Sequence, residues 1–172
     1  VANFNDCCPS SGSLALQELS TFVYSIRENG IACNLFSDSE ANIEIQGKSV
    51  KLVQKTDYPF DGNISITLYP QRSFDFPLFI RIPDWSKSAI VKVNGKPVES
   101  TSVNAGAFCC INRKWKSKDI VELEFPCELK VVTKTELIKA PQSTKDIYKV
   151  NWFALTKGPL VYAMSDLIFG TE

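Results

Sequence analysis

"NISITLY", residues 63–69, and "FPLFIRI", residues 76–82, decide the fold that we predict for this chain. In each stretch every second residue is a large aliphatic one, which is the period of a β-strand with one buried face. We predict that both stretches are strands and that these alternating residues belong to the core: Ile64, Ile66, Leu68, Leu78, Ile80 and Ile82.

Short segments of the same kind recur after Gly30, among them "ANIEIQ", "KSVKLVQKT" and "IVELEF". Turn signals such as "QGK", "NGKP" and "NAG" separate them. Strands at this spacing are typical of an antiparallel sandwich. We therefore predict an all-β protein, an antiparallel β-sandwich of about a dozen strands over residues 31–172. Within it, the polar residues 133–149 are expected to form a long connection.

The segment before the sandwich has a different period. Residues 10–29 begin with serines, continue with apolar residues at helical spacing and precede Gly30, a residue that commonly ends helices. We predict one N-terminal amphipathic helix here. A filled sandwich offers little surface for its apolar face, so Leu19, Phe22 and Ile26 should dock on the outside of a sheet or remain partly exposed.

Composition excludes several classes of function. The 172 residues carry 19 basic and 19 acidic side chains, without the basic patch of a nucleic-acid-binding protein. No apolar run approaches the roughly 20 residues of a membrane span, so we expect a soluble protein with neither nucleic-acid nor membrane partners. The chain has no histidine, which excludes Ser-His and Cys-His nucleophiles and imidazole metal sites.

Cysteine is the most informative residue type that remains. Cys7 and Cys8 are adjacent near the start of the chain, and from the residues alone they can be core filler, a corner of a metal site or a nucleophile beside a ligand. Cys109 and Cys110 fall in a predicted strand, where neighbours face opposite sides and cannot easily serve one metal. Cys33 and Cys127 read as small hydrophobic residues, and we expect all six thiols to be reduced.

Six motifs, in order along the chain, carry a family resemblance. They are "NDCCPSSG", "QKTDYPFDGNISITL", "FIRIPDWS", "VKVNGKPV", "FCCINRKWKSKDIVELEF" and "ALTKGPLVYA". Together they resemble the C-terminal half of glycoside hydrolase family 127, the β-L-arabinofuranosidases. The family has an (α/α)-barrel catalytic domain followed by β-sandwich domains. The resemblance implies that residues 1–30 are a remnant of the upstream barrel and that residues 31–172 are a β-sandwich domain.

The resemblance also implies a chemistry. The family uses a zinc-bound cysteine as nucleophile of a retaining glycosidase, and by this likeness Cys7 is both nucleophile and zinc ligand, while Cys8 is a zinc ligand only. The family's two other zinc ligands, a glutamate and a cysteine, and its acid/base glutamate lie upstream of the matched residues. We therefore expect zinc in the complete enzyme, none bound by this chain and no activity of this chain alone.

The partners follow from the same resemblance. They are carbohydrate, in the form of plant arabinose-containing glycans, and the upstream barrel domain of the same protein, with a dimer through the exposed helix face where the barrel is absent. The compartment stays open between bacterial cytoplasm, periplasm and secretion. The alternative is a non-catalytic carbohydrate-binding or structural module. The aromatic candidates for stacking on sugar, which more often anchor a core, are Tyr58, Phe60, Trp85 and Trp115.

Overall fold

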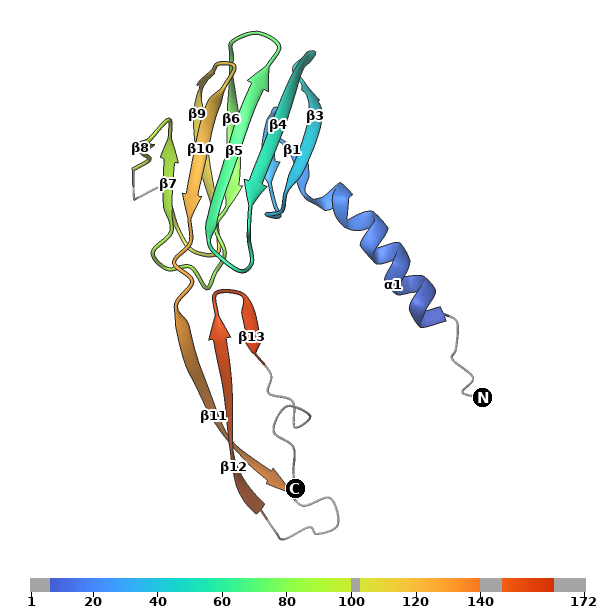
Figure 1. Cartoon of the computed structure of the whole chain (residues 1–172), viewed down its shortest axis with the longest axis vertical. Helices are drawn as coiled ribbons and strands as arrows, with labels where there is room; N and C mark the ends of the chain where they lie inside the picture. The colour runs from blue at the N-terminus through green and yellow to red at the C-terminus, as the bar shows by residue number, and fades with distance from the viewer. Residues whose placement is uncertain (1–6, 100–102, 140–146, 163–172) are drawn as a thin grey trace.

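The computed structural model of the protein describes residues 7–99, 103–139 and 147–162. Figure 1 shows two layers of strands packed face to face, a separate strand ribbon below them, and an N-terminal helix that extends away from both. The described residues are mostly strand, in antiparallel-dominated sheets, so the predicted all-β class and sandwich are confirmed. No helix in this part of the chain has the length and apolar composition that a membrane span requires.

The first layer is a sheet of order β1-β2-β6-β9, and the second is a sheet of order β3-β4-β5-β10-β7-β8. The strands of the first are β1 (Tyr24–Arg27), β2 (Gly30–Cys33), β6 (Phe74–Arg81) and β9 (Phe108–Trp115). Those of the second are β3 (Ser39–Ile45), β4 (Lys48–Thr56), β5 (Asn63–Pro70), β7 (Ile90–Val93), β8 (Lys96–Pro97) and β10 (Asp119–Glu124). Except for β2 with β6, which run parallel, all strand pairs among the described residues are antiparallel.

The core lies between these two layers. The six residues predicted for it are buried there, with at most 3% of any of them exposed, so that prediction is confirmed. Trp115 and Phe125 complete the core with large side chains, and the Trp115 indole donates a hydrogen bond to the carbonyl of Phe76 at 2.9 Å. Burial of the indole therefore leaves no polar atom of that ring without a partner.

The predicted helix over residues 10–29 is correct only in its first half. The α-helix α1 spans Cys7–Glu18, the 3₁₀ helix η1 spans Leu19–Phe22, and Tyr24–Arg27 then form strand β1. The turn after β1 has positive φ at Glu28 (49°) and Asn29 (59°), as a tight hairpin connection requires. This hairpin pairs Tyr24–Arg27 with Gly30–Cys33, and the ladder displaces the helix that local spacing favours.

Gly30 therefore has a different role from the predicted helix stop. It begins β2 beside Pro77 of β6, where a Cβ atom on residue 30 would lie 2.0 Å from the Pro77 carbonyl oxygen. Glycine allows this close approach of two backbones, which brings β2 into its parallel pairing with β6.

A third sheet, of order β11-β12-β13, lies beyond the sandwich. Its strands are β11 (Leu129–Lys139), β12 (Ile147–Lys157) and β13 (Leu160–Tyr162). The long connection predicted for residues 133–149 is wrong at both ends, because β11 and β12 pair without interruption from Leu129 with Lys157 to Lys139 with Ile147. The mixed polar and apolar composition that suggested a loop belongs instead to a β-ribbon, β11 with β12, that is exposed on both faces.

Candidate functional site

The predicted cysteine pair occupies the first two positions of α1. The structure does not describe their side chains, so its geometry does not test their predicted roles. Within the described residues, no group of three or more His, Cys, Asp or Glu residues could hold a metal ion. What the structure does describe is the segment that connects this helix to the sandwich.

The four other cysteines are free and belong to the sandwich or its border. Cys33 and Cys109 are fully buried, and burial raises the pKa of Cys33 to about 12 and that of Cys109 to about 11. Cys110 is exposed on the other side of the same strand, as predicted for neighbours in a strand, and Cys127 is partly buried. The two buried thiols are held in the protonated form, which is neither nucleophilic nor metal-binding.

Helix α1, the 3₁₀ helix η1 and strand β1 present apolar side chains to solvent. All described side chains of α1, residues 11–18, are exposed. The large apolar residues are Leu14, Leu16, Leu19, Phe22 and Ile26, with exposed fractions of 51–75%. Leu19, Phe22 and Ile26 were expected either to dock on the outside of a sheet or to remain partly exposed. They remain exposed. We call these five residues the helix patch.

Val23, directly after η1, anchors this segment to the sandwich. Its side chain is buried, and its carbonyl accepts a hydrogen bond from the Asn34 amide at 2.9 Å. The Asn34 side chain donates to the Phe22 carbonyl at 3.2 Å and to Ser25 Oγ at 3.1 Å. Carbonyls at the end of a helix need such partners, and Asn34 supplies them from the strand end opposite.

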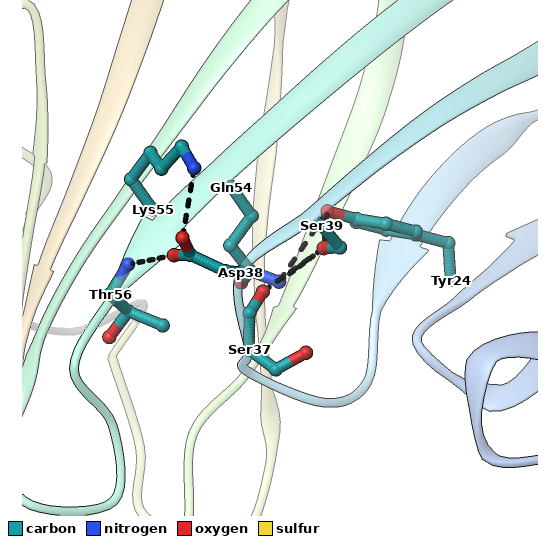
Figure 2. A network of polar contacts seen from close by, with 7 residues as sticks. All are labelled: Tyr24, Ser37, Asp38, Ser39, Gln54, Lys55 and Thr56. Atoms are coloured by element: carbon teal, nitrogen blue, oxygen red, sulfur yellow. Dashed lines mark hydrogen bonds and ion pairs between the residues drawn. The ribbon is translucent and has the colours of Figure 1, made fainter.

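A partly buried polar cluster then fixes β1 against the second layer (Figure 2). Tyr24 Oη and Ser39 Oγ are hydrogen-bonded at 3.1 Å. The Gln54 side-chain amide donates to Ser39 Oγ at 3.2 Å. The same amide nitrogen lies 3.4 Å from both Tyr24 Oη and the Leu35 carbonyl oxygen. Burial raises the pKa of Tyr24 to about 12, although the bond with Ser39 opposes this, so the phenol is neutral. Gln54 is fully buried, and its Oε1 has no hydrogen-bond partner among the described residues. The cluster ties the strand that follows the helix to β3 and β4.

An ion pair borders the cluster on its solvent side. Asp38 accepts hydrogen bonds from Lys55 Nζ and from the Thr56 backbone amide, both at 2.8 Å (Figure 2). These two bonds, the lysine first, lower the pKa of the Asp38 carboxyl. The carboxylate is exposed and already satisfied, so it is suited to holding the β2–β3 connection against β4 rather than to general acid catalysis.

The aromatic candidates separate into core and surface residues. Trp115 is buried, and Tyr58 and Trp85 are partly buried with their rings against Phe125 at centroid distances of 6.4 and 6.1 Å. Phe60 is 71% exposed at the turn before β5. The interpretation as core anchors is therefore correct for three of the four, and they form no platform for a sugar.

Phe60 also marks where the third sheet meets the sandwich. Lys157 at the end of β12 donates to the Phe60 carbonyl at 3.1 Å, and a Cβ on Gly158 would lie 2.8 Å from Cys127 Sγ. A hollow of about 280 Å³ opens beside this contact, lined by Asp61, Asn63, Glu124 and Cys127 among others. The sequence did not predict this junction. The contacting residues are about 30 positions apart for Cys127 and Gly158 and 97 positions apart for Phe60 and Lys157, and no motif links them.

Comparisons with known proteins agree on one family. The family model described as Beta-L-arabinofuranosidase, GH127 middle domain, matches residues 30–127. No curated protein matches the chain. Among solved structures, the chain is similar to a GH127 β-L-arabinofuranosidase from Geobacillus stearothermophilus T6, with 32% sequence identity and a TM-score of 0.70. The match covers 90% of this chain and 23% of the Geobacillus chain.

Two further solved structures are similar over the same share of the chain. One, described as a glycoside hydrolase, has 35% identity and a TM-score of 0.72, and 24% of it is covered. The other, a GH127 β-arabinofuranosidase, has 29% identity and a TM-score of 0.68, and 25% of it is covered. The chain thus spans about a quarter of the length of these relatives. By the match of its sandwich and by these likenesses, the chain belongs to glycoside hydrolase family 127 and contains the family's middle domain.

Proposed function

We propose that this chain is the β-sandwich portion of a zinc-dependent, retaining glycoside hydrolase that acts on β-L-arabinofuranosides or related plant glycans. In the complete enzyme Cys7 is the nucleophile and a zinc ligand, and Cys8 is a second zinc ligand. The observation that carries the proposal is the family match over residues 30–127, with the cysteine pair placed at the start of the helix that leads into the matched domain.

The chemistry of the donor set fits half of such a zinc site. Zinc in proteins is usually held by four ligands, and thiolates are among its preferred ones. Cys7 and Cys8 would supply two, and the chain has no histidine to add. Cys33 and Cys109 are buried in the sandwich with raised pKa values. We propose that the remaining ligands and the acid/base carboxylate come from the upstream domain, as the family resemblance implies, and that the chain alone is therefore inactive.

Each residue then has a defined part in the reaction. Bound zinc would keep a coordinating thiol deprotonated, which is the state that attacks carbon. Cys7 would attack the anomeric carbon from one face of the sugar while a carboxylic acid on the other face protonates the leaving oxygen, and water would release the sugar in a second step.

The helix patch supports the proposed upstream partner. Five large apolar residues are exposed along one segment that begins with the cysteine pair. Exposed apolar surface of this kind marks an interaction site, and we propose that it contacts the upstream barrel domain of the same protein. The dimer through the helix face stays a prediction for conditions in which that domain is absent.

The alternative function, a carbohydrate-binding module, has weaker support. It would require exposed aromatic side chains on one plane, and Trp152 and Tyr162 are indeed 53% and 46% exposed. However, Tyr162 is opposite Leu155 in the β12–β13 register, three positions from Trp152, so the two rings project from opposite faces of the sheet. These two rings cannot stack on the same sugar, although Phe153, 73% exposed and two positions from Leu155, lies on the same face as Tyr162.

A chimaera tests the proposal directly. The upstream portion of the Geobacillus stearothermophilus relative is joined to Val1 of this chain, and zinc per chain and hydrolysis of p-nitrophenyl β-L-arabinofuranoside are measured for the chimaera and the chain alone. We expect about one zinc and measurable hydrolysis in the chimaera, and neither in the chain alone.

Three cysteine variants of the chimaera separate the roles. Cys7→Ser should abolish hydrolysis and weaken zinc binding, Cys8→Ser should weaken zinc binding, and Cys110→Ser, an exposed thiol on β9, should change neither. Full activity of the Cys7→Ser chimaera, or zinc binding that survives both Cys7→Ser and Cys8→Ser, would contradict the proposal.

A further inference from the structure

Three hollows adjoin one another at the end of the second layer nearest to the third sheet, where β5 begins and β10 ends (Figure 1). The first, of about 260 Å³, lies over β5, β10 and β7. The second, of about 360 Å³, lies beside the β4–β5 turn, and the third is the hollow of about 280 Å³ at the junction with the third sheet. Asn63 lines all three, and we call them together the Asn63 trough.

The first hollow is formed by two neighbouring rows of side chains on the outer face of the second layer. The strand registers set these rows out as Lys55–Ser65–Glu122–Lys92 and Asn63–Glu124–Ile90. The alternate residues beneath them, such as Ile64 and Leu123, are buried in the core. The rows therefore stand on packed strands, which hold them in a fixed arrangement.

Most of the polar side chains in these rows have no partner in the protein. Lys55 is paired with Asp38. The other polar members make no side-chain hydrogen bond or ion pair within the part of the chain that the structure describes; they are Asn63, Ser65, Lys92, Glu122 and Glu124. Their hydrogen-bonding groups are thus available to a ligand.

These groups match a ligand that is uncharged and rich in hydroxyls. A carboxylate only accepts hydrogen bonds, an ammonium group only donates them and an amide does both, whereas a hydroxyl donates one and accepts others. Carboxylates outnumber ammonium groups along the trough, so its field opposes the binding of anions. Among the described residues there is also no group that could hold a metal ion.

An aromatic ring borders the trough. Phe60 is 71% exposed, in the turn between Asp57 and Asp61, which line the second hollow. Its carbonyl accepts the hydrogen bond from Lys157, which lines the third hollow. The ring adds a flat apolar surface, of the kind on which the C–H face of a sugar can pack, beside the polar groups.

We propose that the Asn63 trough binds a neutral oligosaccharide, at a site separate from the cysteine pair, and so holds a stretch of the glycan on which the complete enzyme acts. The class of ligand is argued from the groups that line the trough, whereas the role of the ligand as a part of the substrate rests on the proposed function. Asn63 and Glu124 are the central contacts, because each lines more than one hollow. The three adjoining hollows favour a chain of several sugars over a single one.

The test is a titration of the intact, ¹⁵N-labelled chain, followed by the NMR shifts of its backbone amides. The probes are a linear α-1,5-linked arabinopentaose, which is neutral, and pentagalacturonate, which is anionic. We expect saturable shifts around Asn63, Ser65 and Glu124 with the neutral probe, and binding of the anionic probe at least about tenfold weaker. Absence of saturable shifts at millimolar arabinopentaose overturns the proposal.

Two variants assign the binding to the trough. Asn63→Ala and Glu124→Ala should each weaken arabinopentaose binding by about tenfold, since each removes hydrogen bonds to the ligand without touching the core. Asn42→Ala and Glu44→Ala, which change exposed residues of the same types on β3 outside the trough, are the matched controls and should bind as the wild type does. Wild-type affinity in both trough variants, with all four folded by circular dichroism, contradicts the assignment.

Other outcomes identify other surfaces or ligands. Shifts confined to Phe153 and Tyr162 would place the sugar on the third sheet and overturn the proposal. Equal binding of the two probes would overturn the assignment to a neutral ligand.

The outcome is independent of zinc and of Cys7, because the chain is titrated alone. Zinc binding and hydrolysis by the chimaera, without binding in this titration, would therefore overturn this inference and leave the proposed function in place. Binding in this titration, with no zinc in the chimaera, would do the reverse.

Discussion

Cys33 and Cys109 face the interior of the sandwich, whereas the proposed nucleophile lies at the start of an exposed helix. In the proposed enzyme the same type of side chain would thus be used in two ways, according to its surroundings. Burial penalises the charged thiolate and raises the pKa of Cys33 from 9.0 to about 12. Such a thiol acts as a small apolar residue and resists oxidation.

These raised pKa values predict sensitivity to alkali. The thiol of Cys33 has a higher pKa in the folded than in the unfolded chain, so its stabilisation is complete below pH 9.0 and is lost as the pH rises toward about 12. Over this window the free energy of unfolding should fall by about 1.4 kcal/mol per pH unit for this group. Urea denaturation at pH 8 and at pH 10.5 measures the effect.

Two variants show which thiol is responsible. Cys33→Ala should be less stable at pH 8, because it leaves a small cavity, but should lose less further stability at pH 10.5. Cys110→Ala, which removes an exposed thiol, should show nearly the wild-type loss. An unchanged loss in Cys33→Ala would contradict the assignment.

At the scale of elements, η1 and β1 form the connection between an exposed helix and a packed sandwich. Neighbouring residues in this connection have opposite environments, since Phe22 is 59% and Val23 7% exposed. Phe22→Asp should therefore change the free energy of unfolding by less than about 0.5 kcal/mol. Val23→Asp should cost about 3 kcal/mol or more, because it buries a carboxylate. Thermal or urea unfolding compares the two, and a large loss in Phe22→Asp would show that the helix patch packs on this core.

The sequence was sufficient for elements whose pattern is local and strong. The alternating residues of β5 and β6 and the "NGKP" turn with positive φ at Asn94 and Gly95 were predictable because each element's own residues encode it. Residues Tyr24–Arg27 were not, because their spacing also fits a helix and the ladder with β2 decides the outcome. Gly30 fits a helix stop equally well until Pro77, 47 positions later, is seen beside it.

The polar cluster at Gln54 could not be predicted for a related reason. Its members come from β1, β3 and β4, and a glutamine in an alternating strand gives no sign that it will be fully buried. The cysteine pair was recognised from its motif alone, and its roles stay proposals. The family was recognisable because ordered motifs over most of the chain preserve a pattern that no single motif carries.

At the scale of the whole molecule, the sandwich and the third sheet differ in burial. The sandwich encloses the core, whereas β11 to β13 expose large apolar residues on both faces. Backbone amides of β11–β13 should therefore exchange with deuterium much faster than those of β4 and β5, since local opening exposes little buried surface. Hydrogen exchange with mass spectrometry, at concentrations too low for self-association, measures this difference, and equal protection in the two parts would contradict it.

The parallel pairing of β2 with β6 has a consequence for the order of events during synthesis. Asn34, just after β2, is joined to Arg81 at the end of β6 by a hydrogen bond of 2.6 Å across a separation of 47 residues. At ribosomal speed this separation takes roughly 2 to 10 seconds to make. Meanwhile β3, β4 and β5 can form their antiparallel ladder from neighbouring residues, since local pairing closes short loops first. The β1–β2 hairpin, and the cysteine-bearing helix attached to it, would thus be translated before β6 and fixed in place only after it.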